Sequence, residues 1–197
     1  MIVKTKPIDQ TVAQYEAMLE HKDYYAGKIA NLKPESRRMI EVLAVRCLIK
    51  ELLGEEKKLL YDQYGAPRFA DDSRQLSISH TDGYVAVAID DKPVGIDIER
   101  RGRRVERVCS KFLQPSEEAL VSGQDDPLLA MHLIWSAKEA VFKFLGHNYF
   151  DLQNLTCVID FDFNQKIMLM EVERMKKIQT IHFDYNEDYV LCYSTLD

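Results

Sequence analysis

Apolar residues recur at steps of three and four positions in two segments of the chain, and this spacing predicts two long helices. The first covers residues 33–53 and ends before Gly54, a residue type common just after a helix C-terminus. The second runs from Asp126-Pro127, a helix start signal, to about residue 145, before Gly146. Ser116, followed by two glutamates, predicts a short helix ahead of the second long one.

Short apolar runs bounded by polar turns predict strands in two groups. Residues 76–80, 84–89 and 94–99 are separated by the turns TDG and DDKP, which favours an antiparallel meander. A second group closes the chain: 155–161, 177–183 and 189–194. Because a helix followed by a meander occurs twice, we expect an α+β fold of two similar halves, residues 1–101 and 102–197.

Composition and charge narrow the functional classes. The chain has 197 residues, 46% of them hydrophobic, and a formal net charge of −6, which argues against a general nucleic-acid or membrane-surface binder. Its first residues lack the apolar core of a signal peptide, and no apolar run approaches the length of a membrane span. The four cysteines have no paired spacing. We therefore expect a cytoplasmic protein with reduced thiols buried in the core.

The stretch VGIDIERRGRR, residues 94–104, combines a buried strand with two acids and four arginines. Because side chains alternate across a strand, Asp97 and Glu99 are expected on one face, and Ile96 and Ile98 on the other. Two neighbouring carboxylates repel unless a cation lies between them, and Mg²⁺ is a suitable ion. The alternative is a solvated edge strand on which Glu99 pairs with an arginine.

The stretch WSAKEAVFK, residues 135–143, lies on the second long helix. Trp135, Glu139 and Lys143 fall at i, i+4 and i+8, close to one stripe, with Lys138 beside them. Glu139 is a candidate third oxygen ligand or general base, and the two lysines are candidates to bind phosphate. The alternative is an ordinary Glu–Lys pair next to a core tryptophan.

A third candidate stretch is SISHTDG, where Ser79 and His80 end a strand. His80 is either an ordinary hydrogen-bonded residue or a phosphate contact.

These stretches occur in an order that resembles the 4′-phosphopantetheinyl transferases. The quoted motifs are SISHT (77–81), VGIDIE (94–99), KFLQPSEE (111–118) and WSAKEAVFK (135–143). They are most similar to the Sfp-type (surfactin-synthetase-activating) branch, whose members are monomers of two similar halves with coenzyme A bound in the cleft between them. The shorter AcpS-type branch has a single half that trimerises, so the length of this chain favours the Sfp-type form.

The resemblance implies a function and a set of site residues. The enzyme would transfer 4′-phosphopantetheine from coenzyme A to a serine of an apo acyl or peptidyl carrier protein and release 3′,5′-ADP. Asp97, Glu99 and Glu139 would hold Mg²⁺ against the diphosphate, with Glu139 also accepting the serine proton. The implied coenzyme contacts are Arg37, Arg38, Ser79, His80, Lys138 and Lys143, of which Lys143 would also stabilise the leaving phosphate.

The chain departs from the family pattern at one position. Family members often carry Gly-Lys-Pro before the Ser-His motif, whereas this chain has Gly65-Ala66-Pro67, and Arg68 is a candidate to compensate for the missing lysine. The arginines at 100, 101, 103 and 104 either solubilise a loop and pair with Glu106 or dock an acidic carrier protein.

Three rival functions remain open on sequence. A homologue of weakened activity would bind coenzyme A or carrier proteins without efficient transfer. A different Mg²⁺-dependent phosphoryl-transfer enzyme is a second possibility, although the chain has no Gly-rich phosphate loop. A nucleic-acid-binding module using RRGRR is opposed by the acidic net charge.

Overall fold

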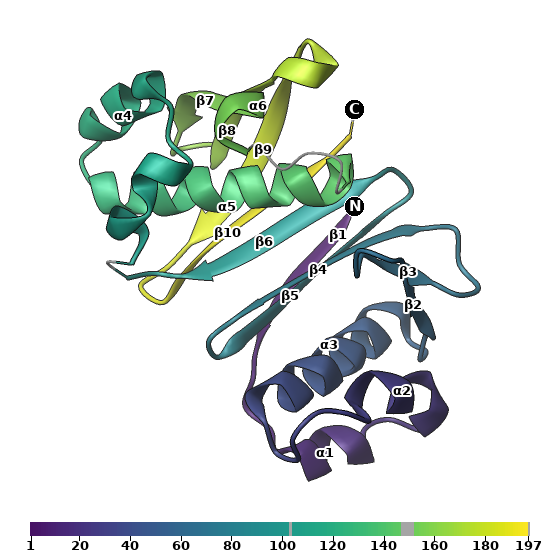
Figure 1. Cartoon of the computed structure of the whole chain (residues 1–197). Coiled ribbons are helices and arrows are strands. Elements are labelled where there is room, and N and C mark those ends of the chain that lie inside the picture. The colour runs from purple at the N-terminus through teal and green to yellow at the C-terminus, as the bar shows by residue number, and fades with distance from the viewer. Residues whose placement is uncertain (103, 147–151, 197) are drawn as a thin grey trace. The chain divides into compact units, whose positions relative to one another are not determined.

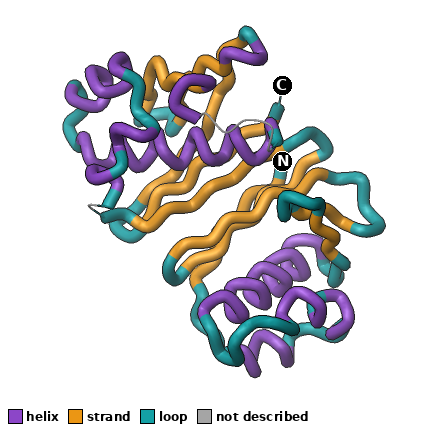
Figure 2. Tube along the Cα trace, viewed as in Figure 1, coloured by secondary structure: helices purple, strands orange, loops and turns teal. Residues whose placement is uncertain are grey.

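The computed structural model describes residues 1–102, 104–146 and 152–196, which divide into two compact units, Met1–Pro93 and Val94–Asp197. Each unit has a long helix packed on an antiparallel sheet, so the predicted α+β class is confirmed (Figures 1 and 2). Among the described residues, no helix is both long and apolar enough to cross a lipid bilayer.

The first unit is built around helix α3 (Arg37–Leu53) and a three-stranded sheet in the order β1-β5-β4. Ser36 caps the start of α3 by accepting a hydrogen bond from the backbone N–H of Met39, and Gly54 ends it with φ 74°. Apolar residues of α3 and the sheet, such as Leu43, Leu48 and Val87, form its core. Its other elements are β1 (Ile2–Pro7), α1 (Val12–Ala17), α2 (Ala26–Ile29), β2 (Leu59–Tyr61), β3 (Pro67–Phe69), β4 (Gln75–Thr81) and β5 (Tyr84–Asp90), with a 3₁₀ turn at Lys22–Tyr24.

The second unit is built around helix α5 (Pro127–Leu145) and a five-stranded sheet in the order β6-β10-β9-β8-β7. In Figure 1, α5 lies along one face of this sheet. Asp126 caps the start of α5, and its C-cap is Gly146, as the sequence predicted. The other elements are β6 (Val94–Arg100), α4 (Pro115–Ser122), α6 (Leu152–Leu155), β7 (Thr156–Asp162), β8 (Ile167–Val172), β9 (Lys177–Tyr185) and β10 (Tyr189–Thr195), with 3₁₀ turns at Val105–Arg107, Cys109–Lys111 and Glu173–Met175.

The predicted meander of residues 76–99 is wrong in its third strand. Strand β5 pairs with β4 on one edge and β1 on the other, so neither edge is left for β6. Strand β6 pairs instead with β10, with Asp97 opposite Cys192. The two units therefore divide at Pro93, and residues 94–101 belong to the second unit instead of the first.

This correction makes the similarity of the two units clearer. In the first unit the opening strand β1 pairs with the closing strand β5, and in the second unit β6 pairs with the closing strand β10. The second unit adds β7 and β8 beyond β9. Strand β8 was missed in the sequence because its run, IMLMEV, does not alternate strictly between apolar and polar residues.

Candidate active site

Strand β6 and helix α5 place the predicted acidic residues together in the second unit. Gly95, Asp97 and Glu99 face α5, while Ile96 and Ile98 are buried on the other face of the strand. The predicted alternation is confirmed. Helix and strand come close enough that a Cβ atom on Gly95 would lie 1.8 Å from the carbonyl oxygen of Ala140. A glycine in VGIDIE is therefore required for this packing.

The stripe predicted on α5 lies over the acids of β6. The indole Nε1 of Trp135 donates to Oε1 of Glu99 at 3.2 Å, and Nζ of Lys143 donates to Oδ1 of Asp97 at 2.9 Å. Lys143 also donates to the carbonyl oxygen of Ile96 at 2.8 Å.

The charge of Asp97 affects the protonation of both glutamates of this group. Burial, together with the charges of Asp97 and Glu139, raises the pKa of Glu99 to about 7 against the opposing effects of Trp135 and Lys143. Burial and the charge of Asp97 also raise the pKa of Glu139, while Lys143 lowers it. Concentrated negative charge in a partly buried place is the environment in which a cation is bound.

The donor set fits Mg²⁺ in its chemistry, because the ion prefers carboxylate oxygens. As the side chains stand, however, no group of three or more His, Cys, Asp or Glu residues in the described part of the chain is close enough to hold a metal ion. The ammonium group of Lys143 lies against Asp97 instead. A dication would therefore compete with Lys143 for Asp97.

Lys138 does not have the exposed position expected of a phosphate contact. Its side chain is completely buried, and its ammonium group donates to Oε2 of Glu117 at 2.7 Å and to the carbonyl oxygen of Phe112 at 2.6 Å. Glu117 is equally buried and accepts further hydrogen bonds of 2.8 Å from the backbone of Gln114 and Val158. An ammonium group held in this way cannot reach a phosphate, so the expectation for Lys138 is corrected.

A second cluster lies at the N-terminus of α3 in the first unit. The buried carboxylate of Glu41 accepts from Arg37 Nε at 2.8 Å and from Arg38 Nη1 at 3.2 Å, and it lies 3.3 Å from Nδ1 of His80. Arg38 also contacts Nε2 of His80. Ser79 is buried on the opposite face of β4 from His80, so the structure does not bring it to this cluster.

The arginine pair has an unusual place on its helix. Helix N-termini carry a partial positive charge and favour acidic side chains, whereas the first turn of α3 begins with Arg37 and Arg38 and has no acidic residue. Both side chains are about half exposed. This accumulation of positive charge is the arrangement expected of an anion site.

A pocket of about 120 Å³ adjoins this cluster. Arg38, Glu41 and His80 line it together with Lys28 and Tyr61. The ammonium group of Lys28 lies 3.7 Å from the centroid of the Tyr61 ring. Sequence reasoning missed Lys28 because it is far from the recognised motifs. Arg68, which was expected to compensate for the lysine missing at Ala66, is exposed and is not among the pocket's lining residues.

The arginines at the end of β6 and just after it differ in their surroundings. Arg101 is held by an ion pair of 2.8 Å to Asp126 and by the carbonyl oxygen of Asn186. Nε2 of His132 lies 3.0 Å from the backbone nitrogen of Gly102 and 2.8 Å from its carbonyl oxygen. Arg100 and Arg104 are exposed. Arg103 lies outside the described residues. Phe112 and Leu113, which follow these arginines in the sequence, are buried in the core.

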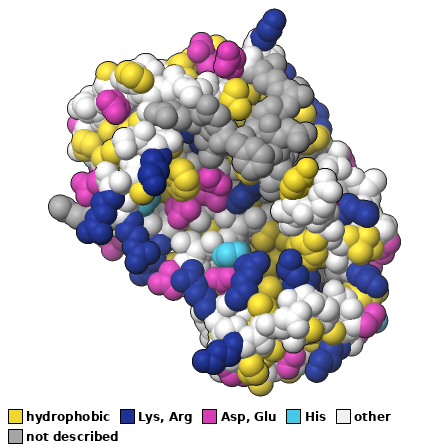
Figure 3. Space-filling model, in the orientation of Figure 1, with side chains coloured by type: hydrophobic (Ala, Val, Ile, Leu, Met, Phe, Trp, Pro, Cys, Tyr) yellow, Lys and Arg dark blue, Asp and Glu magenta, His cyan; other side chains and the backbone are white. Residues whose placement is uncertain are grey.

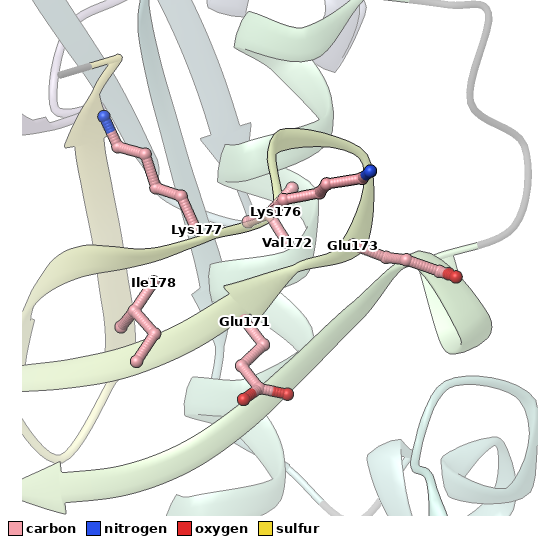
Figure 4. Close-up of a pocket in the computed structure, with 6 residues that line it drawn as sticks. All are labelled: Glu171, Val172, Glu173, Lys176, Lys177 and Ile178. Atoms are coloured by element: carbon pink, nitrogen blue, oxygen red, sulfur yellow. The ribbon is translucent and has the colours of Figure 1, made fainter.

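Another pocket, of about 310 Å³, lies at the turn between β8 and β9, and none of the predicted site residues line it. Figure 4 shows its charged side chains pointing in different directions, with the ends of Lys177 and Glu173 far apart. These groups do not converge on one point. The pocket therefore does not present its charged side chains as a catalytic or ligand-binding group.

Comparison with known proteins assigns the second unit to a family. A profile described as the 4′-phosphopantetheinyl transferase superfamily matches residues 93–194, more than half of the chain. The matched segment contains Asp97, Glu99, Glu139 and Lys143. The first unit, with Arg38 and His80, lies almost entirely outside it.

Individual relatives agree with this match. The chain is 30% identical to the 4′-phosphopantetheinyl transferase gsp of Aneurinibacillus migulanus over 124 residues, 60% of this chain and 52% of the relative. It is 32% identical to a putative 4′-phosphopantetheinyl transferase of Haemophilus influenzae over 61% of this chain and 55% of that protein. For 4′-phosphopantetheinyl transferase Sfp of Bacillus subtilis, the identity is 30% over 41% of this chain and 38% of Sfp.

The chain thus spans about half the length of the first two of these relatives. Similarity to gsp and Sfp supports the Sfp-type branch predicted from the motifs. The profile match, together with the acids of β6 and the lysine and glutamate of α5, shows that the chain belongs to the 4′-phosphopantetheinyl transferase superfamily.

Proposed function

We propose that this protein transfers 4′-phosphopantetheine from coenzyme A to the serine of an apo acyl or peptidyl carrier protein. The observation that carries the proposal is the grouping of Asp97, Glu99, Glu139 and Lys143 within the segment that matches the superfamily. In the reaction the serine oxygen bonds to the β-phosphorus of coenzyme A, the bond from that phosphorus to the bridging oxygen breaks, and 3′,5′-ADP leaves.

The residues of α5 and β6 have distinct roles in this proposal. Glu139 accepts the serine proton, and its raised pKa makes it a stronger base than an exposed glutamate. Lys143 neutralises the phosphate that leaves with the nucleotide. Asp97, Glu99 and Glu139 would hold Mg²⁺, which would withdraw negative charge from the diphosphate oxygens. Such a transfer depends mainly on positioning and charge neutralisation.

The cluster at the start of α3 is proposed to bind the 3′-phosphate of the coenzyme. Arg37, Arg38 and His80 supply the charge and hydrogen-bond donors, and Glu41 holds all three side chains in place. Lys28 lines the same pocket as Arg38 and His80, so we propose that it takes the part of the lysine missing at Ala66.

We propose that the exposed arginines Arg100 and Arg104 help to dock an acidic carrier protein. On the face drawn in Figure 3, Lys and Arg side chains are interspersed with Asp and Glu side chains. Docking of an acidic protein would therefore depend on the local positive charge of these two arginines. Such charge speeds encounter and makes it sensitive to salt. Replacing Arg104 with serine should raise the carrier KM and weaken its salt dependence; an unchanged KM would contradict this role.

We further propose that the enzyme acts as a monomer in the cytoplasm. All four cysteines are free thiols, which suits a reducing compartment: Cys47 and Cys192 are buried, whereas Cys109 and Cys157 are half-buried. The expectation that all four are core residues therefore holds for two of them. Sedimentation analysis in the presence of coenzyme A would test the monomeric state.

Mass spectrometry of an apo carrier protein, incubated with the enzyme, coenzyme A and Mg²⁺, tests the proposed function. We expect the mass gain of one phosphopantetheine group and a loss of at least about 100-fold in rate for Glu139→Gln. Glu171→Gln, an exposed glutamate on β8, is the matched control and should transfer normally. Coenzyme binding without any mass gain across several carriers would indicate a homologue of weakened activity. Absence of coenzyme binding would refute the proposal.

A further inference from the structure

The single tryptophan of the chain lies against one of the proposed metal ligands. Its indole N–H donates to Oε1 of Glu99 at 3.2 Å. Two turns further along α5, Lys143 donates to Oδ1 of Asp97. One stripe of the helix therefore supplies a hydrogen-bond donor to each acid of β6. The proposed function assigns roles to Lys143 and to both acids but none to Trp135.

Packing fixes the position of the indole. The Trp135 ring lies 5.2 Å from the ring of Phe112, centroid to centroid, with the ring planes at 60°. Phe112 is itself fully buried, and its carbonyl oxygen accepts the 2.6 Å hydrogen bond from Lys138. Lys138 is held by Glu117, which also accepts the backbone N–H of Val158 on β7.

These contacts form a continuous support for one side chain. The buried Lys138–Glu117 pair fixes the backbone at Phe112, the ring of Phe112 packs on the indole, and the indole holds a carboxylate oxygen of Glu99. A carboxylate that binds a metal ion commonly has such a partner on one oxygen, which sets its orientation. Trp135 provides this partner without being a ligand itself.

We propose that Trp135 is a positioning residue that holds Glu99 in the orientation required to bind a divalent cation. The inference rests on the proposed function, since only there is Glu99 a metal ligand. Loss of a hydrogen bond that orients a ligand typically weakens metal binding 10- to 100-fold. The buried Lys138–Glu117 pair then has a functional consequence, because it supports the ring against which Trp135 packs.

The test uses Trp135→Phe, which keeps an aromatic ring beside Phe112 and removes the N–H donor. Isothermal titration of the protein with Mg²⁺, in the presence of saturating coenzyme A, gives the affinity for the ion directly. We expect the Kd for Mg²⁺ to rise at least 10-fold in Trp135→Phe, with little change in the Kd for coenzyme A in the absence of Mg²⁺. Tyr185→Phe, which alters an aromatic residue packed against Phe163 and Phe183 in the same unit, should leave both constants unchanged.

A double-mutant cycle separates positioning from general support of the fold. If Trp135 acts through Glu99, then adding Trp135→Phe to Glu99→Ala should cost no further affinity. An equal loss in both backgrounds would overturn the inference, as would an unchanged Kd for Mg²⁺ in the single variant. Wild-type protein that binds coenzyme A but no Mg²⁺ would refute both the metal assignment and this inference. Wild-type binding with an unaffected Trp135→Phe variant would refute this inference alone.

Intrinsic fluorescence gives a measurement that does not require the Trp135 variant to fold. Because Trp135 is the only tryptophan, its emission reports the surroundings of this indole alone. Emission should shift in Glu99→Ala, where the acceptor is lost, and should shift much less in Glu99→Gln, where an oxygen acceptor remains. Identical spectra for wild type and Glu99→Ala would overturn the inference.

Discussion

Lys138 and Lys143 lie five residues apart on α5, and the structure predicts opposite consequences for their replacement by methionine. Methionine has nearly the length of lysine without its charge. In Lys138→Met, the carboxylate of Glu117 remains buried with no cation beside it, although it keeps its bonds from the backbone of Gln114 and Val158. Breaking a buried pair in this way typically costs about 3–5 kcal/mol.

Lys143 is in a different environment. Its side chain is 27% exposed, so water screens its charge even though Asp97 itself is only 7% exposed. Solvent screening reduces the energy of such a pair, so we expect Lys143→Met to lose about 1 kcal/mol or less of unfolding free energy. Its transfer rate should fall by at least about 100-fold, because Lys143 is the proposed phosphate contact.

Urea unfolding followed by Trp135 fluorescence measures the difference, since Trp135 is in the same unit. With an m-value of about 2 kcal/mol per M, the midpoint of Lys138→Met should fall by about 2 M and that of Lys143→Met by about 0.5 M or less. Coenzyme affinity at low urea should be nearly normal in the folded fraction of Lys138→Met. A Lys138→Met protein of wild-type stability and strongly weakened coenzyme binding would refute the assignment of the buried pair and restore Lys138 as a phosphate contact.

Three further predictions concern strand β6. Gly95→Ala should lower the unfolding free energy, measured by urea unfolding, by about 2–3 kcal/mol, because its Cβ would overlap the carbonyl oxygen of Ala140. Gly102→Ala is the control, since a Cβ there meets nothing within 4 Å. Equal losses of stability in the two variants would contradict the close packing at Gly95. Mg²⁺ affinity should fall as the pH drops through about 7, since protons compete for Glu99, whose pKa burial raises to about 7. In metal-free protein the folded state binds this proton more tightly than the unfolded chain, so the Glu99 contribution to stability should decrease as pH rises from about 4.5 to 7. Urea titrations of wild type and Glu99→Gln across this range measure it, and parallel pH profiles would exclude the effect.

The sequence alone determined the features that depend on neighbouring residues. Glycines after the two long helices and the Asp126-Pro127 start marked helix ends correctly, because capping is a local property of the backbone. Alternation placed Asp97 and Glu99 on one face of β6, and the i, i+4, i+8 spacing placed Trp135, Glu139 and Lys143 on one stripe of α5. The order of these motifs was also sufficient to indicate the superfamily.

The tertiary structure decided which of these residues pair with one another and which are enclosed in the core. The partner of β6 is β10, more than 80 residues further along the chain, and no local pattern specifies such a pairing. Lys138 and Lys143 belong to the same motif, yet one ammonium group is enclosed by Glu117 and Phe112 and the other reaches Asp97. A lysine becomes a structural cation or an available one according to what packs around its end. That surrounding comes from segments distant in sequence, so only the folded chain determines it.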